Sequence, residues 1–153
     1  MRILLLSIVL IFVGCGPNIV FEQTYDVGEE WSYDEVMNFV MEAQDTTQQY
    51  DLQFVLDHSV DFTYQNLYVL ISTTYPDGVT VEDIVSLQLA NKLGEFNGSC
   101  SGESCKLIVI LQEGFRFKQL GTHTITIAQH SRREILEGIS SGQLRLVEYV
   151  QDN

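Results

Sequence analysis

The feature that most constrains the fold is a two-residue alternation of apolar and polar side chains in short segments. In the stretch YDLQFVLDH, Tyr50, Leu52, Phe54, Leu56 and His58 fall on one face, and the other face is mostly polar. A period of two is that of a β-strand with one buried face, because successive side chains of a strand point in opposite directions. The pattern therefore predicts a half-buried strand here.

Similar segments recur along the chain, separated by turn signals such as Tyr75-Pro76-Asp77-Gly78. The run from Leu107 to Leu111 is apolar on both faces, which predicts a central strand. The expected strands together predict an all-β fold, an antiparallel β-sandwich of about eight strands. Besides residues 50–58, they cover residues 20–27, 36–43, 66–74, 84–90, 107–112, 122–129 and 144–150.

One segment near the C-terminus reads as a short helix. Ser131 is followed three residues later by Glu134, which matches a capping box. Ile135, Leu136 and Ile139 would then face the core, and Gly142 would end the helix.

The N-terminus has the form of an export signal. Arg2 precedes an apolar run that is too short to cross a bilayer, which takes about 20 residues, and the run stops at Gly14-Cys15. This ending resembles a bacterial lipobox, although a buried helix or a plain signal with an incidental cysteine would also explain it. We expect a lipoprotein signal peptide at residues 1–14, a lipid-anchored tether at 15–18 and a single β-sandwich domain at 19–153.

Cys15 is the residue that we expect to carry the lipid. Its thiolate can take a diacylglyceryl group as a thioether once Gly14 has given the peptidase room to cleave. Each buried methylene of an acyl chain such as palmitate adds about 0.8 kcal/mol of membrane affinity, so two or three chains anchor durably.

The two remaining cysteines, Cys100 and Cys105, flank four small or polar residues. In an exported protein the favoured interpretation is a disulfide that pins a loop, worth about 2 kcal/mol for so short a ring. The alternative is a zinc site completed by His123 and His130, but this spacing matches no usual structural site. No metal is expected.

Charge and motifs limit the classes of function. The net charge is −13, with 21 Asp and Glu against eight Lys and Arg, which disfavours a nucleic-acid partner. The sequence contains no G-x-S-x-G elbow, no phosphate-binding glycine loop, no H-E-x-x-H and no dinucleotide fingerprint. We therefore expect no catalytic residue, no cofactor and no small-molecule substrate.

Four residues are candidates for a partner surface. Trp31 and Tyr68 could expose their rings, and Arg132 and Arg133 could clamp an anionic group. The alternatives are that the rings fill the ends of the core and that the arginines are solvated or paired with carboxylates. Separately, the Asp45-Thr46-Thr47 triplet resembles the O-glycosylation acceptor of exported proteins in Bacteroidota, which makes Thr46 a candidate acceptor or part of a plain turn.

Several separated segments follow the pattern of one known family. They are Cys15, VFEQTY (20–25) with Trp31, residues 50–56, YQNLY (64–68), YPDG (75–78), LAN (89–91) with Gly94, Phe96 and Gly98, residues 129–132, Leu136, Gly138-Ile139 and LRL (144–146). Together they resemble the GldH family of gliding-motility lipoproteins of Bacteroidota, over most of the chain after the signal. The departures from the family pattern are Phe96 where tryptophan is common, His58 near an expected arginine, Ser131 in place of an apolar residue, and the cysteine pair in a loop that is usually Gly-rich.

The resemblance implies a non-enzymatic accessory or structural lipoprotein of the gliding machinery and the associated type IX secretion system. It implies other gliding or secretion subunits as partners, with the membrane contacted through lipid on Cys15. Gly16 and the uncharged residues that follow indicate an outer-membrane location facing the periplasm. The alternative functions are a periplasmic glycan- or peptidoglycan-binding module and, less well supported by motifs, a periplasmic hydrolase.

Overall fold

The computed structural model describes residues 16–150, so the expected signal peptide and Cys15 lie outside the described residues. This part of the chain forms eleven strands, all paired antiparallel where they pair in a sheet. The strands are β1 (Ile19–Asp26), β2 (Glu30–Ser32), β3 (Val36–Ala43), β4 (Tyr50–Ser59), β5 (Asn66–Thr74), β6 (Thr80–Gln88), β7 (Ser99–Ser101), β8 (Ser104–Phe115), β9 (Gly121–Gln129), β10 (Ile135–Glu137) and β11 (Ile139–Glu148).

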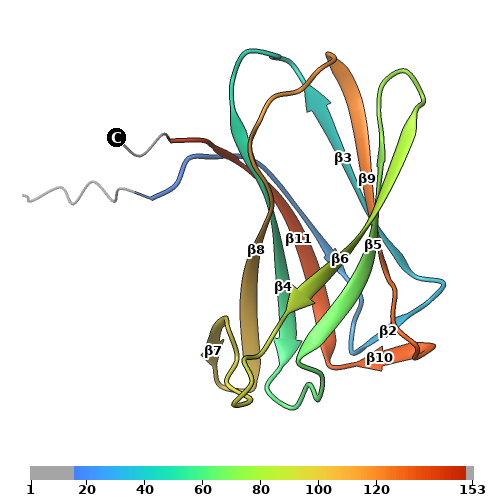
Figure 1. Cartoon of the computed structure of the whole chain (residues 1–153), viewed down its shortest axis with the longest axis vertical. Helices are drawn as coiled ribbons and strands as arrows, with labels where there is room; N and C mark the ends of the chain where they lie inside the picture. The colour runs from blue at the N-terminus through green and yellow to red at the C-terminus, as the bar shows by residue number, and fades with distance from the viewer. Residues whose placement is uncertain (1–15, 151–153) are drawn as a thin grey trace, which may run out of the picture.

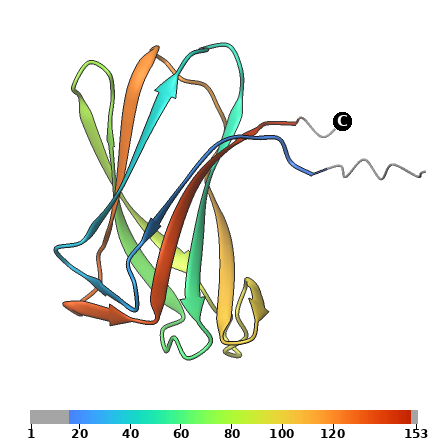
Figure 2. The ribbon, with the colours of Figure 1, turned by 180° about the vertical axis from the view of Figure 1, so that it is seen from behind.

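Two larger sheets face each other, as in a β-sandwich (Figure 1). The five-stranded sheet has the order β1-β11-β4-β8-β7, and the four-stranded sheet has the order β3-β9-β5-β6. A third sheet pairs β2 with β10 at one end of the molecule. Seen from behind, β1 runs alongside β11, and both described chain ends leave from the same side (Figure 2).

The core follows directly from the alternation in the sequence. In β3 the buried positions alternate strictly with exposed ones, so that Met37, Phe39 and Met41 point inward. In β4, Phe54 and Leu56 meet them from the other sheet, and both are fully buried. The all-β prediction is confirmed, because one apolar face on each sheet can be buried only against another sheet.

The edges on one side of the molecule are closed by a glutamine. Gln23 of β1 donates from Nε2 to the Asn38 carbonyl at 3.2 Å and accepts at Oε1 from the Val40 N–H at 3.0 Å. Both partners are backbone groups of β3, so the edges of the two large sheets are joined there. On the other side, β6 and β8 have no such bridge among the described residues.

The predicted helix near the C-terminus is wrong. Residues 16–150 contain no helix at all, and therefore none long and apolar enough to cross a membrane. Instead Leu136 lies in β10 opposite Trp31, and Gly138 has φ of +87°, a left-handed conformation that a helix interior cannot contain. Leu136 and Ile139 are buried as predicted, but from strands.

The strand predicted at residues 107–112 is confirmed within β8, but the prediction that its run from Leu107 to Leu111 lies in a central strand is wrong. β8 lies next to β4 on one side, but on its other side it meets only the three residues of β7, which pair with Ser104, Cys105 and Lys106. Ile108 and Ile110 are each 53% exposed.

Candidate functional site

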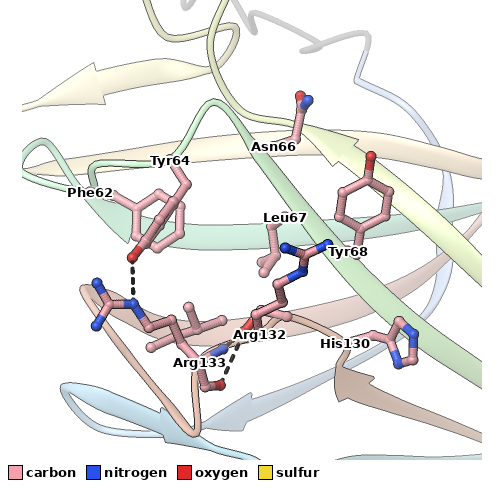
Figure 3. Close-up of a pocket in the computed structure, with 10 residues that line it drawn as sticks. Phe62, Tyr64, Asn66, Leu67, Tyr68, His130, Arg132 and Arg133 are labelled. Carbon is pink, nitrogen blue, oxygen red and sulfur yellow. Dashed lines mark hydrogen bonds between the residues drawn. The ribbon is translucent and has the colours of Figure 1, made fainter.

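A pocket of about 660 Å³ opens at the end of the molecule where β2 and β10 lie. Its walls come from the β4–β5 connection, the start of β5 and the loop from β9 to β10. Figure 3 shows tyrosines on one side and arginines on the facing side. The lining residues are Phe62, Tyr64, Asn66, Leu67, Tyr68, His130, Ser131, Arg132, Arg133 and Leu136.

The arginine side of the pocket is held by the side chain of Gln129, which is 2% exposed. Its Nε2 donates to the carbonyl oxygens of Arg133 at 3.0 Å and Glu134 at 3.1 Å. Its Oε1 accepts from the Ser131 hydroxyl at 2.7 Å. This side chain satisfies the loop carbonyls, so the loop keeps a fixed shape without secondary structure.

Ser131 completes the turn. Its hydroxyl oxygen accepts from the Arg133 N–H at 3.0 Å, as a serine does at the start of a helix, but the chain then continues as a strand. The Tyr33 hydroxyl donates to the Ser131 carbonyl, which ties this loop to the segment after β2.

The tyrosine side of the pocket is exposed to solvent. Tyr64 is 39% exposed and Tyr68 is 49% exposed. The Tyr64 ring packs edge-on against Phe62, with 5.6 Å between ring centroids. Its hydroxyl accepts from Arg133 Nε at 3.1 Å, which links the two sides of the pocket (Figure 3).

Three of the four residues predicted for a partner surface come together in this pocket, namely Tyr68, Arg132 and Arg133. Both arginines are exposed. The ion pairs in residues 16–150 are Lys106 with Asp57 and Arg145 with Glu22, so neither pocket arginine is neutralised by a described carboxylate. They form a cationic spot on a chain of net charge −13.

Trp31, the fourth candidate, does not belong to a surface. It is fully buried, and its indole N–H donates to the Glu35 carbonyl at 2.8 Å. Its strand pairs with β10 at Leu136, whose side chain lines the pocket, so Trp31 supports the pocket from inside the core. The alternative interpretation, that this ring fills the end of the core, is the correct one.

The pocket also contains two residues that the sequence analysis did not place on a partner surface. His130 and Asn66 are exposed and line it. The signal for His130 was its place beside the polar run from Ser131 to Glu134, which we interpreted as a helix start; Asn66 had no such signal.

The other predicted sites lie elsewhere. Cys100 and Cys105 form a disulfide across the β7–β8 hairpin, which uses both thiols and excludes the zinc interpretation. Thr46 lies half-exposed in the β3–β4 connection, and its glycosylation stays a prediction. Lipidation of Cys15 falls outside the described residues. Within residues 16–150, no three His, Cys, Asp or Glu side chains gather as a metal ion would require.

The histidines on the strands are packed. His58 is 1% exposed, with Nδ1 2.9 Å from the Ser59 carbonyl and its ring centroid 4.8 Å from that of Phe96. His123 is 3% exposed and lies against Phe117.

Comparison with known proteins adds the family. The profile of the family described as GldH lipoprotein matches residues 19–144. A "Gliding motility lipoprotein GldH homolog" of Christiangramia forsetii is 25% identical over 145 residues, covering 90% of this chain and 89% of the relative. The "Gliding motility lipoprotein GldH" of Flavobacterium johnsoniae is 29% identical over 151 residues, covering 94% and 93%.

Among solved structures, dimeric latent PorU from Porphyromonas gingivalis matches 89% of this chain and 14% of its own length, with 9% identity and a TM-score of 0.36. A score this low does not establish a shared fold. The family profile covers most of the chain and includes Trp31, Tyr68, Arg132 and Arg133. The chain belongs to the GldH lipoprotein family.

Proposed function

We propose that this protein is a lipid-anchored, non-enzymatic component of the gliding machinery and its associated type IX secretion system, held at the periplasmic face of the outer membrane. The observation that carries the proposal is the match to the GldH lipoprotein family over residues 19–144. The lipobox-like ending at Cys15 supplies the anchor.

The pocket end supplies the contact with another subunit. Two exposed guanidinium groups on an acidic surface attract a carboxylate-bearing segment and repel a basic one. Tyr64 and Tyr68 add aromatic area beside them, and aromatic and arginine side chains are those that dominate binding energy at interfaces.

The test is a cross-linked pull-down of the tagged lipoprotein from its native outer membrane. We expect gliding or secretion subunits to be recovered with the unaltered protein and to be lost with Cys15→Ala, because the unanchored chain leaves the membrane. Recovery of the protein alone from the anchored form would contradict the assembly role.

Two double variants that remove the same charge test whether the partner binds at the pocket. Arg132→Ala with Arg133→Ala removes two pocket cations, and Arg116→Ala with Lys118→Ala removes two exposed cations beyond the far end of β8. We expect the first pair to lose the partner and to abolish gliding, and the second pair to retain both. Equal loss in both pairs would indicate a general charge effect and not a contact at the pocket.

The exposed tyrosines favour a second candidate, binding of a glycan such as peptidoglycan, because sugar rings stack on aromatic side chains. Tyr68→Ala would then abolish retention on purified peptidoglycan fragments. If the unaltered protein is not retained on peptidoglycan fragments, this candidate is ruled out. It is also ruled out if Tyr68→Ala is retained as well as the unaltered protein.

A further inference from the structure

One sheet edge of this molecule is apolar and unprotected. From Leu107 to Gln112, β8 pairs with β4 on one side and has no strand on the other among the described residues. This stretch carries no charge. On one face Ile108 and Ile110 are each 53% exposed, and on the other face Val109 and Leu111 are only partly buried against the core. Such an edge is a template for a further strand, because its outward N–H and C=O groups have no partner.

The other long edges are protected. Gln23 joins the edges of β1 and β3, as described above. In β6, Asp83 lies opposite Ile71, which is buried, so a carboxylate points to the inner face of that edge strand. An inward-pointing charge prevents another strand from adding, because the added strand would bury it. Among the long edge strands in residues 16–150, β8 is the one that has neither the glutamine bridge nor an inward-pointing charge.

The sequence of the edge indicates its occupant. Leu107-Ile108-Val109-Ile110-Leu111 reads the same in both directions. If a second copy pairs antiparallel about Val109, Ile108 meets the second copy's Ile110 and Val109 meets its own equivalent. A two-fold interface requires such self-complementarity, in which the same patch serves on both subunits.

The length of the free edge agrees with this register. β7 occupies the outward side of β8 at Ser104, Cys105 and Lys106, and the Cys100–Cys105 disulfide joins the two strands. In the symmetric pairing Gln112 of the second copy would meet Lys106, which β7 already covers. Gly98, just before β7, lies against the backbone of Lys106 and Leu107, so Leu107 is covered as well. The window that remains between the two copies' covered ends is therefore Ile108–Ile110, the centre of the palindrome.

The anchor does not obstruct this edge. β1, which follows the expected tether, lies at the opposite edge of the same sheet. We propose that two copies of this chain associate through antiparallel pairing of β8 about Val109, through residues 108–110, which joins their large sheets into one.

Cysteine cross-linking of the full-length lipoprotein in its native membrane tests the proposal. Val109→Cys places a thiol on the two-fold axis, where cross-strand Cβ atoms lie about 5 Å apart and a disulfide can form. Val85→Cys is the matched control, because Val85 is also half-buried and lies in another edge strand, β6, whose edge is protected.

After mild oxidation we expect Val109→Cys to shift to twice the monomer mass on a non-reducing gel, and Val85→Cys to stay at the monomer mass. Equal cross-linking of the two variants would overturn the proposal. So would a Val109→Cys product whose second chain is a different protein.

The register and the surface are tested separately. In a mixture of differently tagged Ile108→Cys and Ile110→Cys chains, we expect cross-links between unlike variants and few between like ones. Adding Ile110→Lys to Val109→Cys should abolish the dimer band, whereas Ile84→Lys, at a 57% exposed position on β6, should leave it intact. Cross-linking that survives Ile110→Lys would overturn the proposal.

The dependence of dimer yield on salt concentration is an independent test. Each copy carries a net charge of −13, so the copies repel each other over a Debye length of about 10 Å at 0.1 M salt. We expect dimer yield to rise with added salt, because the interface itself is uncharged. A yield that falls with salt would contradict an apolar strand pairing.

Discussion

Gln129 is the residue on which the shape of the pocket most depends. It is a polar side chain in the core, and the atoms that it contacts include the carbonyls of Arg133 and Glu134 and the hydroxyl of Ser131. A buried amide is tolerated only when its donors and acceptors are satisfied, and here they are satisfied by one loop. The glutamine thus replaces a regular element as the support of the arginine side.

Replacement of Gln129 by alanine should therefore destabilise the fold and loosen the loop that forms the arginine side of the pocket. The loop carbonyls lose their donor, and we expect the free energy of unfolding to fall by about 2–3 kcal/mol. Chemical denaturation followed by circular dichroism measures this change. Gln88→Ala, at an exposed position, is the control and should change stability by less than about 0.5 kcal/mol. An equal loss in the two variants would mean that the buried hydrogen bonds do not carry the effect.

The Asp45 turn gives a prediction about pH. The Thr47 N–H and hydroxyl donate to Asp45 Oδ1 at 2.6 and 2.7 Å, and these bonds hold the pKa of the Asp45 carboxyl below its ordinary value of 3.8. Because the folded-state pKa is lowered, the stabilisation is present above pH 3.8 and is lost as pH falls through the folded-state pKa.

Thr47→Val removes the hydroxyl bond and keeps the backbone bond, so the pKa of Asp45 should rise part of the way toward 3.8. An NMR titration of the Asp45 carboxyl measures it. Thr46→Val should leave this pKa unchanged, because the hydrogen bonds that hold Asp45 come from Thr47. If the pKa of Asp45 changes equally in Thr47→Val and Thr46→Val, the Thr47 hydroxyl is not the cause of its lowered value.

At the scale of elements, the two-residue alternation predicted those strands that are long enough to show it. The alternation in β3 and β9 gave both the strands and the buried faces. The short strands β2, β7 and β10 were missed, which is why eleven strands stand against the eight expected; three residues are too few to show a period. The Ser131–Glu134 pattern was misread as a helix because its cap is satisfied locally, whereas Gly138 and the pairing of Leu136 with Trp31 decide the outcome through tertiary contacts.

In β11, Gly142 is required by packing and not by backbone conformation. A Cβ at this position would fall on Met37 Sδ and lie 2.8 Å from Phe54 Cε2, and both residues come from other strands. Gly142→Ala should therefore destabilise the fold by about 2–3 kcal/mol, through overpacking of the core. Thermal unfolding measures the loss.

A double-mutant cycle with Met37→Ala identifies the clash. In that background the cost of Gly142→Ala should shrink by at least about 1 kcal/mol, because the clash with Met37 Sδ is removed while the close contact with the Phe54 ring remains. If the costs of Gly142→Ala and Met37→Ala simply add, the destabilisation by Gly142→Ala does not come from its contact with Met37.

At the scale of the whole molecule, the candidate site could be predicted only in part. Arg132 and Arg133 were visible as adjacent cations, and Tyr68 as an aromatic beside a turn. That they share one pocket depends on the pairing of β5 with β9, which alternation cannot give because it assigns faces and not neighbours. Trp31 was misassigned for the same reason, since its cover, β10, was not recognised as a strand.

The positions of the anchor and the pocket determine how the molecule responds to mechanical force. β1 begins at Ile19, beside the chain end, and runs toward Asp26 and the end of the molecule that holds β2, β10 and the pocket (Figure 2). A pull between the membrane and a partner in the pocket is therefore directed along the strands. The β1–β11 hydrogen bonds lie across that direction, so they share the load and do not open one by one.

Single-molecule pulling can compare two directions. With one handle at the N-terminus and the other at Arg132, we expect rupture at a higher force than with handles at the two termini. In the second arrangement the pair Ile19 and Val147 opens first, and β1 peels away. Equal rupture forces would contradict this account. The proposed tether at one end of β1 and the proposed contact at the other would make this small domain a load-bearing link, strong in the direction in which a moving cell surface would pull it.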